Sequence, residues 1–493
     1  MLDLSSSGAR SRAGHRRRRG AWLSVIAAAV VLALGVPTAS TAAVRAGGTQ
    51  RAGSAAQAAA AQTAAYQTTE QYVIRYWGRW VTYTQQSTIA RIHGTNTLLG
   101  PATINPRFQA VNLINDDTIY AFGYVDVRNG PAVLTIPATN VTFSILVLDM
   151  FQEVVPVSIP ASPGKYLLVS PGWRGTVPAG LTKVTVPYPV TLWNIRADKY
   201  SSNVNMIAQA MAFRAALHMT TLADYEADPA SGPAKVLPVV PTFAVSLKVA
   251  EDTAATLAPN VFLRTLQAAV ADPSTTPLYP SDLQLAHAFN QDFAAAQQAA
   301  RRGNPVPLAR IDAAVRAAYA AIVVRWRSHT GATNWIHFNN IADWGTAYLD
   351  RAAANEFCMG CNNEAAAGYW MAFADGAGQR LNGARHSYTL TFPAGDIPQA
   401  KRFWSVTAYT PGFIELVPNR ADKYLVASYT PGLVTNPDGS ITIYLSPTRP
   451  AGVPMANWLP VPRYPFEIAL RAYGPTGNTA NPGYAPPAIT PAP

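Results

Sequence analysis

Three carboxylates in the sequence stand where they could take part in proton transfer. Asp116 and Asp117 directly precede an apolar segment that predicts a strand, and Glu364 follows two asparagines. A carboxylate beside a bound substrate can act as a general acid or base, so all three are candidate catalytic residues of a hydrolase. Adjacent strand residues point to opposite faces, so Asp116 and Asp117 are not expected to act as a pair on one surface.

Each carboxylate also has a structural interpretation. An aspartate before a strand often accepts hydrogen bonds from backbone N–H groups and so caps a turn. For Glu364, the alternative is the first turn of a helix that Asn363 caps and that continues through AAAGYW.

Aromatic and cationic residues form a second set of candidates, for ligand binding. Trp173 and Arg174 share the turn sequence PGWRG, where the arginine offers a bidentate fork and the tryptophan a flat apolar face. Tyr120 follows the two aspartates, and Trp404 and Trp458 stand further along the chain. We therefore expect these five residues to bind a glycan or another small ligand. The alternative is that the aromatic side chains pack in the core.

The two cysteines, Cys358 and Cys361, are separated by two residues, one of which is Gly360. In an exported chain this spacing favours a disulfide that closes a small turn. The alternatives are a redox motif like that of thioredoxin and half of a metal site. A closed zinc site needs four ligands, and the sequence has no second CxxC and no paired-histidine motif. We therefore expect no metal and no cofactor.

The first 45 residues predict export. Six arginines between Arg10 and Arg19 precede the apolar stretch 21–36, and small residues follow at 39–46. This order is that of a secretory signal peptide. An uncleaved membrane anchor is the alternative, but the apolar stretch is shorter than the ~20 residues that span a bilayer. We expect the mature protein to be secreted or held in the cell envelope.

Removal of the signal changes the charge that the mature protein carries. The formal net charge of the whole chain is +11, and residues 1–43 contain six arginines and one aspartate, so the charge falls to +6. The remaining basic residues form no block of like charge, which disfavours nucleic-acid binding. No second long apolar run predicts a membrane span, and the sequence does not predict the oligomeric state.

Changes in composition divide the rest of the chain. Residues 46–65, rich in Ala, Gly and Gln, predict a disordered leader, and a helix is expected from Glu70. Residues 66–220 predict a β domain, with strands at 119–127, 132–137, 141–151, 165–171 and 181–188. Residues 221–345 predict a helical connector, in which apolar residues between Ile311 and Trp326 repeat every three to four positions.

Strands return in residues 346–475, at 387–393, 402–410, 423–430, 440–446 and 466–473, and predict a second β domain. The tail 476–493, rich in Pro, Gly and Asn, is expected to be disordered. The predicted fold class is mainly β with α, with two antiparallel β-sandwich domains joined by a helical connector. The hydrolase site would lie between these two β domains.

Several motifs resemble known families. NDDTIY at 115–120, AVLTIP at 132–137 and SPGWRG at 170–175 resemble domain of unknown function 1254 (DUF1254). LNG at 381–383, FWS at 403–405, DGS at 438–440, NWLPVP at 457–462 and RAY at 471–473 resemble domain of unknown function 1214 (DUF1214). The resemblance implies two jelly-roll-like β-sandwich domains with helices around them and frequent export. It implies no settled activity, because a fold can host many functions.

Overall fold

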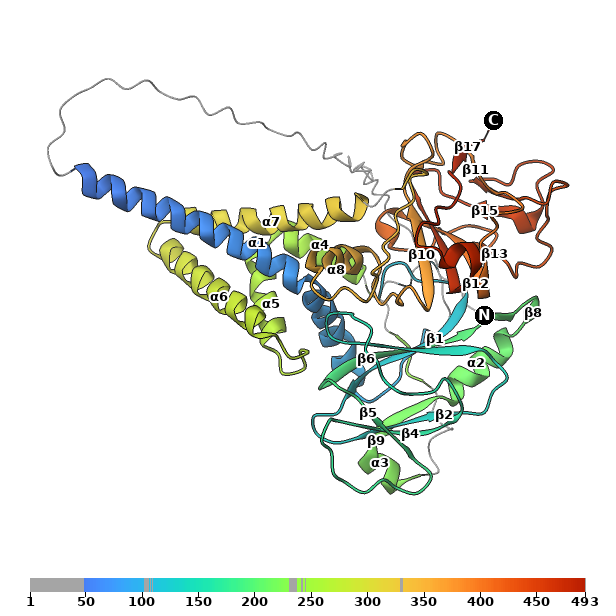
Figure 1. The fold of residues 1–493 in the computed structure, drawn as a ribbon, viewed down its shortest axis with the longest axis horizontal. Helices are drawn as coiled ribbons and strands as arrows, with labels where there is room; N and C mark the ends of the chain where they lie inside the picture. The colour runs from blue at the N-terminus through green and yellow to red at the C-terminus, as the bar shows by residue number, and fades with distance from the viewer. Residues whose placement is uncertain are drawn as a thin grey trace, which may run out of the picture. The chain divides into compact units, whose positions relative to one another are not determined.

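The computed structural model of the chain describes residues 48–101, 106, 108, 110–229, 237–240, 243, 245–328 and 331–492 (Figure 1). The predicted signal peptide, residues 1–45, lies outside the described residues. Residues Gln57–Pro493 form one compact unit. In the preceding unit, Met1–Ala56, the described part is the beginning of the first helix.

Helix α1 (Gly48–His93) begins within the segment for which we expected no fixed structure. Alanine and glutamine have high helix propensity, so a helix that is anchored further along can extend through them. The anchor is the part after Glu70, where Tyr72, Tyr76, Trp77 and Trp80 are buried at helical spacing.

The β1–β9 region contains two sheets whose apolar residues share one buried cluster around Trp193. The first sheet has the order β1 (Thr118–Asp126), β6 (Val190–Asp198), β3 (Phe143–Leu148), and both of its strand pairs are antiparallel. The second has the order β5 (Thr182–Thr185), β4 (Gly164–Val169), β2 (Ala132–Ile136), β9 (His218–Thr221), with β4 and β5 parallel. The small hairpin β7 (Tyr200–Ser201) and β8 (Val204–Asn205), with α2 (Ile207–Ala216) and α3 (Leu222–Ala227), completes the region.

Four long helices lie in the segment for which we expected a helical connector. They are α4 (Leu247–Leu257), α5 (Pro259–Ala271), α6 (Pro280–Arg301) and α7 (Val306–Arg327), and α8 (Tyr348–Phe357) follows. Helices α5 and α6 begin with a proline, where the missing N–H would have no partner in any case. The predicted apolar face of α7 is buried from Ile311 to Trp326.

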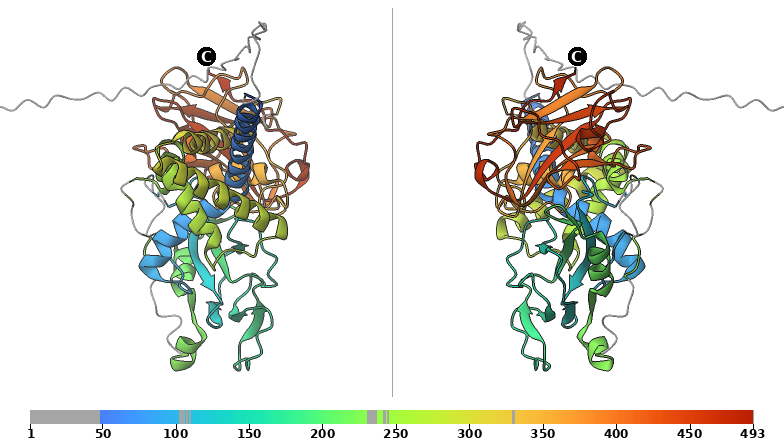
Figure 2. Two further views of the ribbon diagram at one scale, coloured as in Figure 1. Left: turned by 90° about the vertical axis from the view of Figure 1, so that its left-hand side faces the viewer. Right: turned by 90° about the vertical axis from the view of Figure 1, so that its right-hand side faces the viewer.

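The β10–β17 region has the same plan, with two sheets that share one buried cluster. One has the order β10 (Ala367–Ala372), β16 (Glu467–Pro475), β12 (Ala400–Tyr409), β13 (Leu425–Ala427). The other has the order β15 (Trp458–Pro460), β14 (Ile441–Ser446), β11 (Tyr388–Phe392), β17 (Thr490–Pro491), with β14 and β15 parallel. Three short 3-10 helices lie at Pro411–Phe413, Met455–Asn457 and Gly477–Ala480. Figure 2 shows the two regions as separate groups of strands.

The fold class differs from the expectation in one respect. Within the described residues, the eight α-helices contain more residues than the strands, so the protein is mixed α/β rather than mainly β. The difference arises because α1 is long and because α4 to α7 are long helices. None of the helices in the described ranges is both long enough and apolar enough to cross a membrane.

The strand β10 replaces the helix that was the structural alternative for Glu364. Residues 367–372 are all buried and pair with β16. A strand buried on both faces has no need of alternating polar residues, and Tyr369 and Trp370 favour strands. The alternative with Asn363 as a helix cap was therefore wrong.

The tail after Pro475 is ordered, although its composition predicts disorder. Ile489 is fully buried, and Thr490 and Pro491 pair with β11. The indole N–H of Trp335 donates to Pro487 O at 2.8 Å, and that of Trp370 donates to Tyr484 O at 3.1 Å. Buried indole groups need such acceptors, which the tail supplies.

We expect Ile489→Ala to lower the free energy of unfolding by about 2–5 kcal/mol, because it leaves a cavity in a packed core. Thr490→Ser, at the exposed neighbouring position, is the control and should change it by less than about 0.5 kcal/mol. Urea unfolding measures both. Equal stability of the two variants would contradict an ordered tail.

Candidate functional site

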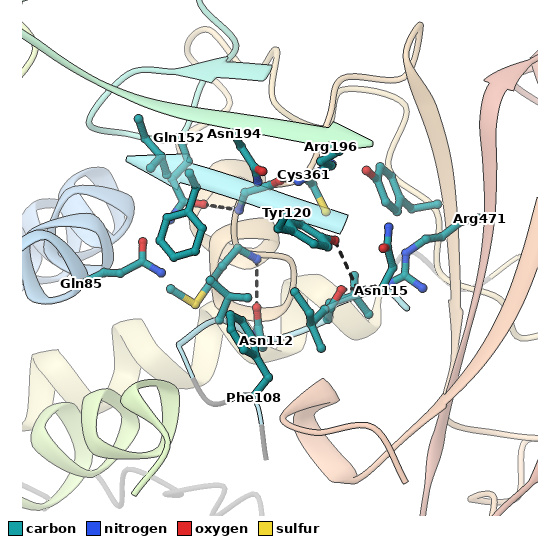
Figure 3. Close-up of a pocket in the computed structure, with 18 of the residues that line it drawn as sticks. Gln85, Phe108, Asn112, Asn115, Tyr120, Gln152, Asn194, Arg196, Cys361 and Arg471 are labelled. Carbon is teal, nitrogen blue, oxygen red and sulfur yellow. Dashed lines mark hydrogen bonds between the residues drawn. The ribbon is translucent and has the colours of Figure 1, made fainter. Parts of the chain in front are cut away.

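A pocket lies where the β1–β9 region meets the β10–β17 region (Figure 3). Its cavity volume is about 50 Å³, and about 680 Å³ is unfilled when the opening to solvent is counted. A water molecule needs roughly 10–15 Å³ of cavity, so the enclosed part has room for only a small group. Apolar side chains form much of the wall, and they include Phe108, Val111, Leu113, Ile114, Phe122 and Leu192.

Strands β1 and β6 place the polar groups on one side of this pocket. In their antiparallel register, Tyr120 lies opposite Arg196, and Phe122 lies opposite Asn194. Alternate residues of a strand share a face, so Leu192, Asn194 and Arg196 of β6 line the pocket together. The side-chain oxygen of Asn194 is buried and accepts no hydrogen bond.

Arg196 is the residue with the most unusual surroundings. Its side chain is buried, with 5% of the residue exposed, and its guanidinium lies 5.3 Å from the centre of the Tyr120 ring. Nη2 donates to Gly360 O at 2.7 Å, whereas the buried Nε has no hydrogen-bond partner among the described residues. Burial lowers the pKa of Arg196, but Tyr120, Tyr473 and Tyr369 outweigh this effect and raise it. Within the described part of the chain, no carboxylate forms an ion pair with Arg196.

Arg471, a second arginine of the pocket, differs because its guanidinium has several acceptors. Nη2 donates to Leu113 O and to the Tyr409 hydroxyl, both at 2.7 Å, and Nη1 contacts the Thr407 hydroxyl at 3.4 Å. Asp117 also interacts with it electrostatically. Arg471 therefore has a structural role that Arg196 lacks.

The turn that contains the two cysteines forms another part of the wall. Cys358 and Cys361 form the expected disulfide, and Met359, Gly360 and Cys361 line the pocket. The Met359 N–H donates to Asn112 Oδ1 at 2.9 Å, and the Gly360 N–H donates to Gln152 Oε1 at 2.8 Å. Asn112 and Gln152 also line the pocket, so these hydrogen bonds hold the cysteine turn against the polar side of the pocket.

The two aspartates proposed as catalytic residues lie outside the pocket lining. Asp117 is fully buried and accepts hydrogen bonds from the Ser405 hydroxyl at 2.8 Å and the Tyr429 hydroxyl at 2.6 Å. These contacts join the two β regions, and they differ from the turn cap that was the structural alternative. Asp116 forms an ion pair with Lys199 and is less buried. Burial raises the pKa of both carboxyl groups.

Glu364 lies beside His337 and also outside the pocket lining. Its Oε1 is 3.6 Å from His337 Nε2, and the His337 ring stacks on Trp370. Burial raises the pKa of Glu364 to about 7 and lowers that of His337. Both shifts favour the neutral forms, so the contact is not an ion pair at neutral pH. The three carboxylates therefore do not converge on one site.

The residues predicted to bind a ligand do not lie together in the structure. Trp404 and Trp458 are buried, and the Trp458 indole donates to Ser446 O at 3.0 Å. Trp173 packs against a small apolar cluster of the β2–β4 sheet, and Arg174 is exposed. Tyr120 is the one predicted ligand-binding residue that lines the pocket among the described residues.

The sequence analysis missed Asn194 and Arg196 because it did not assign β6. The signal was present in VTLWNIRAD, where the polar residues Asn194 and Arg196 alternate with apolar residues. Polar side chains on a strand that is otherwise apolar on both faces indicate a buried polar site. Within the described residues, no group of three His, Cys, Asp or Glu side chains is arranged to hold a metal.

Two family descriptions match separate parts of the chain. Residues 95–221 match "Protein of unknown function (DUF1254)", and residues 366–477 match "Protein of unknown function (DUF1214)". The expected tandem arrangement is confirmed. The first match contains β1 to β9 and the second contains β10 to β16, so both contribute to the pocket. No curated protein matches the sequence.

Two solved structures are similar to the chain. The VPA0106 protein from Vibrio parahaemolyticus is 20% identical with a TM-score of 0.55, over 87% of this chain and 100% of that chain. An uncharacterized protein from Burkholderia cenocepacia is 13% identical with a TM-score of 0.41, over 86% of this chain and 94% of that chain. At this identity, the likeness to the Vibrio protein shows a shared fold alone.

We expect Asp117→Asn to lower the free energy of unfolding by roughly 2–4 kcal/mol, because the new amide N–H₂ would face hydroxyl donors in a buried site. Asp116→Asn, which removes a partly exposed ion pair, should cost less than about 1 kcal/mol. Urea unfolding of both variants measures the difference. A larger loss for Asp116→Asn would contradict the role assigned to Asp117.

Glu364 should make stability depend on pH. Its pKa is raised from 4.5 to about 7 in the folded protein, because burial favours the protonated form. The contribution of Glu364 to the free energy of unfolding is therefore fully present below about pH 4.5 and is lost as the pH rises to about 7. Glu364→Gln, which keeps a neutral side chain, should therefore gain stability relative to the natural protein across this window. Thermal unfolding at several pH values measures the gain, and a parallel dependence in both proteins would contradict it.

Proposed function

This chain belongs to the proteins that carry DUF1254 and DUF1214 regions in tandem, and we propose that it binds a small organic anion in the pocket between them. The observation that carries the proposal is the buried Arg196 guanidinium without a carboxylate partner. A buried charge is costly unless it is paired, so the protein gains most from a ligand that supplies the missing negative charge.

The walls of the pocket define the rest of the ligand. Phe108, Phe122 and Leu192 present an apolar surface, so the anion should carry an apolar part. The unpartnered oxygen of Asn194 can accept a hydrogen bond from a hydroxyl or amide group of the ligand. A carboxylate with a short apolar body and one donor group matches these features.

A carboxylate fits this pocket better than an uncharged glycan does. Glycan binding was expected from exposed aromatic faces, but Trp404 and Trp458 are buried in the core. A hydrolase that uses Asp116, Asp117 and Glu364 is not the function we propose, because the three carboxylates lie outside the pocket lining and do not converge on one site. Small-ligand binding therefore has the better support.

The same proposal includes the location and the finer fold. We infer that the mature protein works outside the cytoplasm, secreted or in the cell envelope, which the signal-like first 45 residues and the disulfide support. We also infer that the paired sheets of each region are β-sandwiches of jelly-roll type. The shared buried cluster of each sheet pair supports this interpretation.

Ligand-observed NMR with propionate and benzoate tests the binding proposal, with propionamide and benzamide as uncharged controls. We expect the carboxylates to bind and the amides to bind at least about tenfold more weakly, since a hydrogen bond to a charged group contributes about 1.5–3 kcal/mol. Arg196→Gln should weaken carboxylate binding by a similar factor.

The matched control is Arg174→Gln, which removes the same charge from an exposed position outside the pocket lining. It should leave carboxylate affinity unchanged. Equal affinities for the acids and the amides, or equal losses in the two arginine variants, would contradict an anion site at Arg196.

A further inference from the structure

The disulfide joins Cys358 and Cys361, and only Cys361 lines the proposed anion site. Cys361 lines the pocket and is 8% exposed, whereas Cys358 is 2% exposed and ends α8. Among the described residues that line the pocket, Cys358 is absent. A molecule that occupies the pocket therefore approaches the disulfide from the side of Cys361.

Arg196 holds a positive charge next to this disulfide. Its Nη2 binds the carbonyl oxygen of Gly360, the residue directly before Cys361. The Nε of the same guanidinium is buried and has no hydrogen-bond partner among the described residues, so it is the donor that remains for an anion in the pocket. An anion bound at Arg196 would lie close to Cys361, on the side of the pocket where Figure 3 draws Arg196 and Tyr120.

We propose that Cys361 is a thiol-exchange site for low-mass thiols that carry a carboxylate, an inference that rests on the proposed anion site. The thiolate of the bound molecule attacks Cys361 Sγ, a new sulfur–sulfur bond forms, and the bond between Cys361 and Cys358 breaks. Cys358 leaves as a thiolate and takes up a proton from solvent. The incoming thiol is oxidised to a mixed disulfide, and Cys358 is reduced, so the electrons balance.

The position of Cys358 explains why the anion site matters for this reaction. Cys358 follows the last turn of α8, and the negative end of a helix dipole disfavours a thiolate. A poor leaving group slows thiol–disulfide exchange. Exchange should then be slow for thiols that do not bind and faster for those that Arg196 holds beside Cys361.

Exchange kinetics with three small thiols test the proposal on the full mature chain. Mercaptopropionate carries a negative charge, mercaptoethanol is uncharged, and cysteamine carries a positive charge. Each rate is divided by the rate of the same thiol with the oxidised peptide Cys-Met-Gly-Cys, so that intrinsic thiol reactivity cancels. The released Cys358 thiol is trapped by alkylation, and peptide mass spectrometry locates the adduct.

We expect the normalised rate for mercaptopropionate to exceed that for mercaptoethanol by roughly tenfold, the factor that one charged hydrogen bond supplies. Cysteamine should be slowest, and the adduct should be on Cys361. Arg196→Gln should remove the preference, and Arg174→Gln should retain it. Equal normalised rates for the three thiols, or an adduct on Cys358, would overturn the proposal.

Competition with propionate keeps the test decisive if Arg196→Gln fails to fold. Propionate bound at Arg196 should slow the exchange of mercaptopropionate. Propionate that binds without slowing mercaptopropionate would overturn the exchange site alone. Absence of propionate binding together with equal thiol rates would overturn the anion site as well.

Discussion

Several buried polar groups of residues 113–117 have their partners in the β10–β17 region, and the rest of the structure depends on this constraint. Asn115 Nδ2 donates to the Tyr473 hydroxyl at 2.5 Å, Asp117 accepts from Ser405 and Tyr429, and Leu113 O accepts from Arg471. All of these groups are buried, so separation of the two regions would leave several of them unsatisfied at a cost of about 1–3 kcal/mol each. The NDDTIY motif therefore joins two sheet regions that are far apart in the sequence.

The same interface creates the pocket and its charge. Because Arg471 already donates to one carbonyl and two hydroxyl acceptors, it has less capacity for a ligand than Arg196. Arg196 donates to one carbonyl group and interacts with the Tyr369 hydroxyl, and its buried Nε has no partner among the described residues. It stands between an apolar wall and the disulfide turn. A buried cation without a paired carboxylate lowers stability unless something compensates for it. We infer that the protein retains this arrangement because a ligand completes it.

Local sequence patterns predicted most of the helices and strands, whereas the other elements depend on long-range contacts. The period of α7 and the turn-bounded strands of both β regions were readable because each element carries its own pattern of buried residues. The strand β10 and the ordered tail were not, because their conformations depend on partners more than 90 residues away, such as β16 and β11. Tyr120 and the disulfide were found from local motifs. Arg196 was missed because β6 was not predicted as a strand, and the packed structure then shows that its Nε has no partner among the described residues.

A crystal structure of the protein soaked with bromopropionate tests the central claim most directly, because the bromine identifies the ligand by its anomalous scattering. We expect a carboxylate within hydrogen-bond reach of Arg196 Nε, at about 2.7–2.9 Å, with the bromine against the apolar wall near Phe122. A protein carboxylate paired with Arg196, or bromine bound only outside the pocket, would contradict it.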